Sequence, residues 1–215
     1  MPWPATHVLI AEKCYAPFFS HLNHSDFIIG NCFPDIRYPA GIERDRTHIN
    51  HASLTQIQTC TAFRAGVLFH NLVDILWNTY IRQNEAKLFT VIPHDRPMFH
   101  TMKILQDHFL YHEILDWKNI AAYFNAILPE EQEYGIGKTM IQQWHAMLKA
   151  YFGKPLDKSD LRMLSQTLPE ELVRDIANYY DKFRENEILN MIMCAFYQDF
   201  ELIMDQQMPN GLGLH

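Results

Sequence analysis

The stretch "FRAGVLFHNLVDILWNTY", residues 63–80, decides the fold that we expect for this chain. Its apolar residues recur with the 3.6-residue period of an α-helix, and the pattern runs from Leu54 to about Arg82. One imidazole and one carboxylate, His70 and Asp74, stand four residues apart within it. Because residues i and i+4 share a helix face, both side chains can reach one metal ion. The other interpretation is a His–Asp hydrogen bond that stabilises the core.

Further helical patterns surround this central helix. The first third of the chain is broken by Pro, Gly, Asn and Asp, which indicates short helices joined by ordered loops. After a break at "VIPHDRP", helices are expected at residues 98–117, 118–127, 139–152 and 169–207. We therefore predict an all-α protein with a single domain over residues 1–215, ending in a flexible tail at about 208–215.

Composition narrows the classes of function. The 215 residues are 48% hydrophobic, which is enough for a sizeable core. The net charge of -7 argues against a broad basic surface for duplex nucleic acid, which is bound through clustered Lys and Arg. No stretch approaches the ~18 apolar residues of a transmembrane segment, and the start of the chain does not resemble a cleavable signal peptide. We expect a cytoplasmic protein with reduced cysteines, although export by a dedicated secretion system stays open.

Histidine is the residue type that asks for a chemical explanation, with 12 copies scattered along the chain. Several of them stand beside residues that favour metal binding. His7 opens an apolar helical pattern, Asp35 follows a proline in a predicted loop, and His48 precedes the central helix. Imidazole and carboxylate are ligands for zinc and for other transition metals. The remaining histidines include four that we expect at the surface, namely His94, His100, His145 and His215.

Four short fragments occur in a recognisable order. They are "TH" at residues 6–7, "PDI" at 34–36, "RTH" at 46–48 and "AGVLFHNLVD" at 65–74. In this order they resemble the zinc-dependent phospholipase C family, whose all-helical fold is shared with zinc-dependent single-strand nucleases. The resemblance covers about residues 5–80 and fades afterwards.

The resemblance implies a ligand set and an activity. It implies one zinc held by Asp35, His48, His70 and Asp74, with Asp74 bridging to a second zinc held by His7 and the N-terminal amine. The implied reaction is the hydrolysis of a phosphodiester or phospholipid head group by metal-bound hydroxide, with Asp35 as a candidate catalytic base. One to three ions are expected, and iron, manganese or nickel are alternatives to zinc.

The sequence departs from this pattern at two places. The chain begins "MPWP" where the family usually exposes an N-terminal tryptophan, and Asn78 stands where many relatives have a further histidine. His108 and His112, at i and i+4 of a predicted helix, could supply the missing ligands, or could be partly exposed surface residues. Arg37 and Arg46 could bind substrate phosphate, or form ordinary surface salt bridges.

Three alternatives to a phospholipase C-like enzyme remain at this point. The first is a nuclease-like enzyme of the same fold. The second is a metal-binding protein that has lost catalysis. The third is a helical domain in which hydrogen bonds satisfy the core histidines. The oligomeric state is not predicted.

Overall fold

The computed structural model describes residues 3–48, 52–114, 116–154, 161 and 168–207, without the side chains of 205–207. The α-helices are α1 (Pro4–Cys14), α2 (His24–Cys32), α3 (Arg37–Ala40), α4 (Leu54–Gln58), α5 (Ala62–Gln83), α6 (Glu85–Leu88), α7 (Arg96–Leu110), α8 (Trp117–Tyr123), α9 (Pro129–Gln132), α10 (Lys138–Phe152), α11 (Glu170–Phe183), α12 (Glu187–Gln198) and α13 (Phe200–Gln207). One π segment, η1 (Tyr15–Phe19), and three 3-10 segments, η2 (Phe33–Ile36), η3 (Arg44–Arg46) and η4 (Tyr111–Glu113), lie between them. The described residues include no strand, so the predicted all-α class is confirmed.

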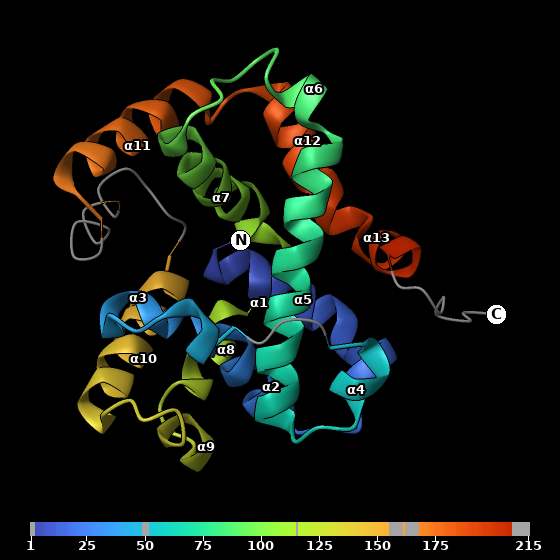
Figure 1. Ribbon diagram of the computed structural model, residues 1–215, viewed down its shortest axis with the longest axis vertical. Coiled ribbons are helices and arrows are strands. Elements are labelled where there is room, and N and C mark those ends of the chain that lie inside the picture. The colour runs from blue at the N-terminus through green and yellow to red at the C-terminus, as the bar shows by residue number, and fades with distance from the viewer. Residues whose placement is uncertain (1–2, 49–51, 115, 155–160, 162–167, 208–215) are drawn as a thin grey trace.

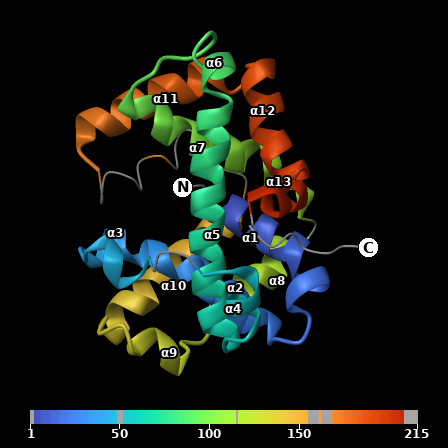
Figure 2. The ribbon, with the colours of Figure 1, turned by 45° about the vertical axis from the view of Figure 1, so that its right-hand side comes forward.

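Helix α5 is the axis of the molecule, and Figures 1 and 2 show it running from α6 at one end to α4 at the other. Its buried residues include both His70 and Asp74 near its middle. Helices α7, α11 and α12 pack together beside one half of α5, while α2 packs along the other half. Helix α1 contacts α2, α5 and α7, so its buried residues lie where the two halves meet.

Two glycines set the close crossing of α2 and α5. A Cβ atom on Gly30 would lie 2.1 Å from the carbonyl oxygen of Phe63, and one on Gly66 would lie 2.1 Å from the carbonyl oxygen of Phe27. Real Cβ atoms do not come this close to backbone atoms, so any larger residue would push the helices apart. The missing side chains therefore allow the α2 backbone to reach the polar residues of α5.

Asp107 of α7 accepts the hydrogen bonds that cap the first turn of α1. Its carboxylate accepts hydrogen bonds from the backbone N–H groups of Ala5 and Thr6, both at 2.8 Å, and from the Thr6 hydroxyl at 2.5 Å. The Tyr151 hydroxyl of α10 donates to the same carboxylate at 2.5 Å. The N-cap residue of α1, Trp3, supplies no side-chain cap. Asp107 thus satisfies the orphan N–H groups of a helix that belongs to another part of the chain.

Four predicted helices are shorter or divided in the structure, including the one expected at residues 118–127, which ends as α8 at Tyr123. The segment expected from Leu54 to Arg82 divides into α4 and α5, and residues 169–207 divide into α11, α12 and α13. In the second case the Asn186 side chain accepts a hydrogen bond from the Leu189 N–H at 2.9 Å and starts a new helix. The periodicity continues across both breaks because each piece still buries an apolar face.

The helix predicted over residues 98–117 is also wrong in its second half, because α7 ends at Leu110. The Trp117 indole N–H donates to the Tyr111 carbonyl at 2.6 Å, and the Tyr111 hydroxyl donates to the Phe152 carbonyl at 2.8 Å. The three rings stack in sequence, with centroids 5.0 and 5.2 Å apart. This aromatic stack on α10 folds the chain back where helical propensity alone would continue it.

No helix of the described residues is long and apolar enough to cross a membrane. The expected flexible tail at 208–215 lies outside the described residues.

Candidate metal centre

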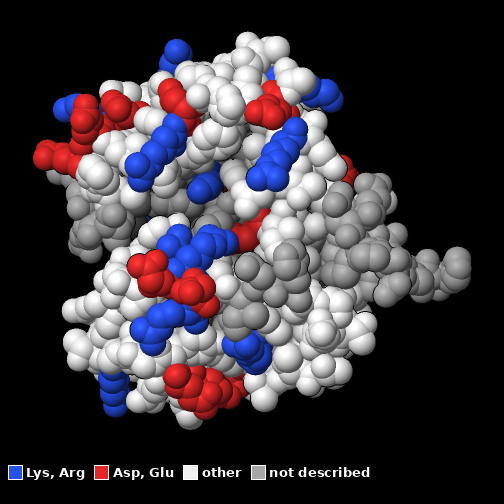
Figure 3. Space-filling model, viewed as in Figure 1, with Lys and Arg blue, Asp and Glu red and all other residues white. Residues whose placement is uncertain are grey.

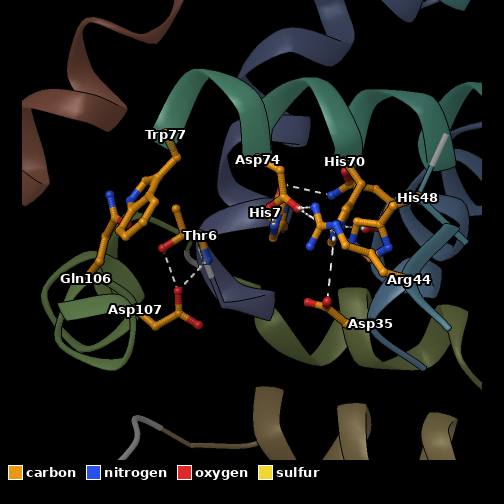
Figure 4. Close-up of polar contacts among 11 residues, drawn as sticks. Thr6, His7, Asp35, Arg44, His48, His70, Asp74, Trp77, Gln106 and Asp107 are labelled. Atoms are coloured by element: carbon orange, nitrogen blue, oxygen red, sulfur yellow. Dashed lines mark hydrogen bonds and ion pairs between the residues drawn. The ribbon is translucent and has the colours of Figure 1, made fainter. Parts of the chain in front are cut away.

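Three histidines and two aspartates from four separate segments converge beside the middle of α5. Figure 4 shows the rings of His7, His48 and His70 and the carboxylates of Asp35 and Asp74 directed toward one another. His7 comes from α1, Asp35 from η2, His48 from the loop after η3, and the other two from α5. All five are buried, and the three histidines and Asp74 are at most 4% exposed. The structure thus gathers the residues that the sequence pattern had singled out.

The separations between donor atoms suit a transition-metal ion. The Asp74 carboxylate lies 3.4 Å from His7 Nε2 and 3.5 Å from His48 Nε2. His70 Nε2 lies 3.8 Å from Asp74 Oδ2 and 4.0 Å from Asp35 Oδ1. Tetrahedral zinc, with bonds near 2.0–2.1 Å, holds its ligands about 3.3–3.5 Å apart, so only small movements would close the shell.

Two overlapping groups of donors result from this geometry. One consists of His7, His70 and Asp74, and the other of Asp35, His48 and His70, with the donor atoms of each group within 4.8 Å of one another. His70 belongs to both, yet its Nε2 atom can coordinate only one ion. The two groups are therefore parts of one centre and cannot be filled as independent sites.

The orientation of His70 follows from the close crossing of α2 and α5. Its Nδ1 lies 2.8 Å from the backbone carbonyl of Asn31, which can only accept a hydrogen bond. Nδ1 therefore carries the proton, and Nε2 directs a lone pair toward the two carboxylates. Asn31 is adjacent to Gly30, so the same glycine contact that brings the helices together sets the tautomer of the ring.

A relay through Thr47 orients His48 in the same way. The Thr47 hydroxyl donates to the Pro34 carbonyl at 2.9 Å, so its oxygen accepts from His48 Nδ1 at 3.0 Å. His48 Nε2 then presents its lone pair to the centre. Hydrogen bonds of this kind on the far nitrogen are typical of metal-ligating histidines, whose orientation and basicity they set. Thr47 is completely buried, which keeps water from competing for either bond.

His7 is held by packing rather than by hydrogen bonds. Its ring stacks on that of His70 with centroids 3.8 Å apart and planes 7° apart. Neither ring nitrogen has a hydrogen-bond partner among the described residues. The Asn31 amide donates to the His7 backbone carbonyl at 2.9 Å, and Asp107 fixes the preceding residue, Thr6. The backbone of His7 is thereby held from both sides while its ring stays available to a ligand.

Several buried polar atoms of the centre lack partners in the described structure. They are both ring nitrogens of His7, Nε2 of His48 and His70, and Oδ1 of Asp35 and Asp74. Burying polar atoms without partners is unfavourable, and so many in one place would destabilise the fold. A metal ion could satisfy one such atom from each of the five residues together, because these atoms have no hydrogen-bond partner that competes for their lone pairs.

The pKa shifts of His7, His48 and Asp74 favour the protonation states that metal binding requires. Burial, reinforced by His70, lowers the pKa of His7 to about 4. Burial likewise lowers the pKa of His48. Burial would raise the pKa of Asp74, but His70, His48 and His7 outweigh it and hold that pKa well below its usual range. At neutral pH, neutral His7 and His48 therefore face an ionised Asp74, and little proton release would oppose the ion.

Three arginines near the centre have different surroundings. Arg44 donates from Nη2 to Asp74 Oδ2 at 3.0 Å, and its side chain is 46% exposed. Arg46 instead donates to the Tyr134 carbonyl at 2.7 Å, away from the cluster. Arg37 stacks over the Tyr38 ring at 4.0 Å, and its Nε is buried without a hydrogen-bond partner. The predicted role of Arg46 as a phosphate ligand has no support in these contacts.

The predicted HxxxH pair does not join the centre. His108 lies near the end of α7, with Nδ1 3.0 Å from the Tyr180 hydroxyl, while His112 is exposed in η4. Because α7 ends between them, they do not share a helix face as the sequence predicts. Asn78, one turn after Asp74, is also exposed. Within the described part of the chain, no donors beyond the five clustered residues extend the centre.

The surface assignment of His145 is wrong. This residue is 3% exposed, and its Nε2 lies 2.7 Å from Glu131 Oε1. His94 is exposed, as expected, and His100 is half-buried. His215 lies outside the described residues.

Sequence reasoning missed the residues that orient the ligands. Asn31 acts through its backbone carbonyl, which no side-chain pattern can reveal. Asp107 stands in a helix more than a hundred residues after its partner Thr6, so no local spacing in the sequence connects the two. Thr47 was part of the fragment "RTH", but its hydroxyl relay depends on a carbonyl 13 residues earlier.

Comparison with known proteins adds no assignment. A scan against protein-family models, a search of curated proteins and a search of solved structures each gave no significant match. Any function must therefore be inferred from the centre itself and from the sequence fragments that build it.

Proposed function

We propose that the five-residue cluster binds zinc and that the protein is a metal-dependent phosphoester hydrolase of the phospholipase C-like type. The observation that carries the proposal is the convergence of five buried His and Asp residues, each with at least one polar atom that has no hydrogen-bond partner among the described residues. Asp35, His48, His70 and Asp74 would hold the principal ion, with His7 beside it. The sequence fragments that supply these residues are those that resemble the zinc-dependent phospholipase C family.

The residues fit hydrolysis as well as binding. When bound, zinc acts as a Lewis acid that polarises a phosphoryl oxygen and lowers the pKa of water. Asp35 is the most exposed of the five, at 9%, and its Oδ1 is unpaired, so it can accept a proton from an attacking water. Arg44 stands half-exposed at Asp74, where its guanidinium can neutralise a phosphoryl oxygen.

Metal analysis and a hydrolysis assay test the proposal together. Full-length protein is expressed with added zinc, dialysed, and analysed for metal and for hydrolysis of p-nitrophenyl phosphorylcholine and bis(p-nitrophenyl) phosphate. The expected result is about one or more zinc ions per chain and activity that a chelator abolishes. His70→Ala should lose both. His94→Ala is the matched control, because His94 is an exposed histidine outside the cluster. A content below about 0.3 metal per chain would refute the proposal.

A second candidate is a metal-binding protein without catalysis. Two observations favour it, namely the exposure of Asn78 and the position of His108 and His112 outside the cluster. A further zinc held by those residues has no support in the described structure. Stoichiometric zinc with no hydrolysis of either ester would select this candidate.

A further inference from the structure

A cavity lies outside the metal centre, between one face of α10 and the segment that joins α8 to α9. Its volume of about 500 Å³ is within the range of pockets that bind small molecules, roughly 300–1,000 Å³. Figures 1 and 2 show α9 and α10 in the half of the molecule opposite α6, α11 and α12. None of the residues that line the cavity is acidic, and none belongs to the metal centre. This cavity is called the α10 pocket below.

One face of α10 forms a wall of the α10 pocket. It contributes Lys138, Gln142, His145 and Lys149, which follow one another at intervals of four, three and four residues. This spacing keeps all four side chains on one face of a helix. At a rise of about 1.5 Å per residue, the two lysine Cα atoms lie about 16 Å apart along the helix axis. The pocket therefore has one cation at each end of this wall.

His145 is the buried member of this wall and is only 3% exposed. Its Nε2 lies 2.7 Å from Oε1 of Glu131, whose other carboxylate oxygen accepts a hydrogen bond from the Leu128 N–H at 2.7 Å. Glu131 is completely buried, so its carboxylate orients the imidazole ring from inside the fold. His145 makes no other hydrogen bond among the described residues, so its Nδ1 remains available to a ligand in the pocket.

The two lysines of the pocket have no carboxylate partner within the described part of the chain. Lys149 donates to the Asn125 side chain at 3.2 Å, and no ion pair forms at Lys138. Lys138 also begins α10, whose first turn has no side-chain cap, so the positive end of the helix dipole adds to its charge. The net charge of the protein is -7, and Figure 3 shows Lys and Arg interspersed with Asp and Glu on one face. The pocket thus concentrates positive charge on a protein that is acidic overall.

We propose that the α10 pocket binds a small polyhydroxylated molecule with an anionic group at each end, such as a sugar bisphosphate. Lys138 and the first turn of α10 bind one phosphate, and Lys149 binds the other. Lysine side chains are long and flexible, so the two ammonium groups can approach a ligand that is shorter than the distance between their backbones. Between them, His145 and the amides of Gln132 and Gln142 offer donors and acceptors to hydroxyl groups. The inference does not depend on the proposed function, because the pocket shares no residue with the metal centre.

Three ligands that share a sugar and differ in charge test the pocket. Purified full-length protein is titrated calorimetrically with fructose 1,6-bisphosphate, fructose 6-phosphate and fructose. The expected dissociation constant of the bisphosphate is below about 1 mM and at least about tenfold lower than that of the monophosphate, while fructose should not bind. Added salt should weaken binding of the bisphosphate most. Inorganic phosphate is measured after each titration, so that hydrolysis at the metal centre is not taken for binding.

Variants locate the bound ligand. Lys138→Met and Lys149→Met should each weaken binding of the bisphosphate about fivefold or more, and Gln142→Trp should abolish it by filling the pocket. Lys118→Met is the matched control and should leave the affinity unchanged, because Lys118 is an exposed lysine of α8 that does not line the pocket. A dissociation constant above about 1 mM, or equal affinities for the bisphosphate and the monophosphate, would overturn the proposal. So would wild-type affinity in any of the three pocket variants, and each of these results would leave the proposed hydrolase intact.

Discussion

Replacing Thr47 by valine tests whether the hydrogen-bond relay behind His48 prepares the centre for metal. Valine has nearly the same shape as threonine and replaces the hydroxyl by a methyl group. The change therefore removes both the bond to the Pro34 carbonyl at 2.9 Å and the bond from His48 Nδ1 at 3.0 Å. The packing volume stays the same, so any effect is due to the missing hydroxyl.

The structure gives the size of both expected effects. Two buried polar groups, the Pro34 carbonyl and the His48 N–H, lose their partner, and each loss costs about 1–3 kcal/mol. We expect the free energy of unfolding of the metal-free protein to fall by about 2–6 kcal/mol. His48 also loses the bond that selects its tautomer, so zinc affinity should fall about 10–100-fold, or about 1.4–2.7 kcal/mol.

Two measurements separate these effects. Urea unfolding of the chelator-treated protein gives the stability change, and competition with a chromophoric chelator gives the zinc dissociation constant. Thr47→Ser is the control, because it keeps the hydroxyl and removes only a methyl group. If Thr47→Val bound zinc as tightly as the wild type, the relay would have no part in metal binding. The assigned orientation of His48 would then be refuted.

Three further predictions concern the framework around the centre. Gly66→Ala would set a Cβ atom against the Phe27 carbonyl, so stability should fall by more than about 3 kcal/mol in urea unfolding; a loss under 1 kcal/mol would contradict the close crossing. Asp107→Ala leaves two buried N–H groups of α1 unpaired, so the urea midpoint should fall by the equivalent of about 3–5 kcal/mol. An unchanged midpoint would show that these hydrogen bonds do not stabilise α1. Burial lowers the pKa of His100 from 6.5 to about 4 in the folded protein. As the pH falls, the unfolded chain therefore binds a proton on His100 before the folded chain does. Stability should therefore fall as pH drops from 6.5 towards 4, and His100→Gln should flatten the fall in urea midpoints; parallel curves would refute this assignment.

The helical class and the central helix could be predicted because both depend on local periodicity. The apolar spacing around His70 and Asp74 is long and regular, and the structure contains a buried helix there, Ala62–Gln83. Helix ends were less predictable. The end of α7 at Leu110 depends on aromatic contacts with Phe152, about forty residues later, and no local pattern carries that information.

The sequence alone determined which residue types could bind a metal and in what order they occur along the chain. It placed His70 and Asp74 on one helix face, because the helical repeat acts over four residues. Only the tertiary structure decided that His7, Asp35 and His48 meet them and that His108 and His112 do not. The physical reason is that two missing side chains, at Gly30 and Gly66, let α2 and α5 touch. A backbone carbonyl then orients His70 and a buried hydroxyl orients His48, and such contacts depend on distance in space rather than on spacing in the chain.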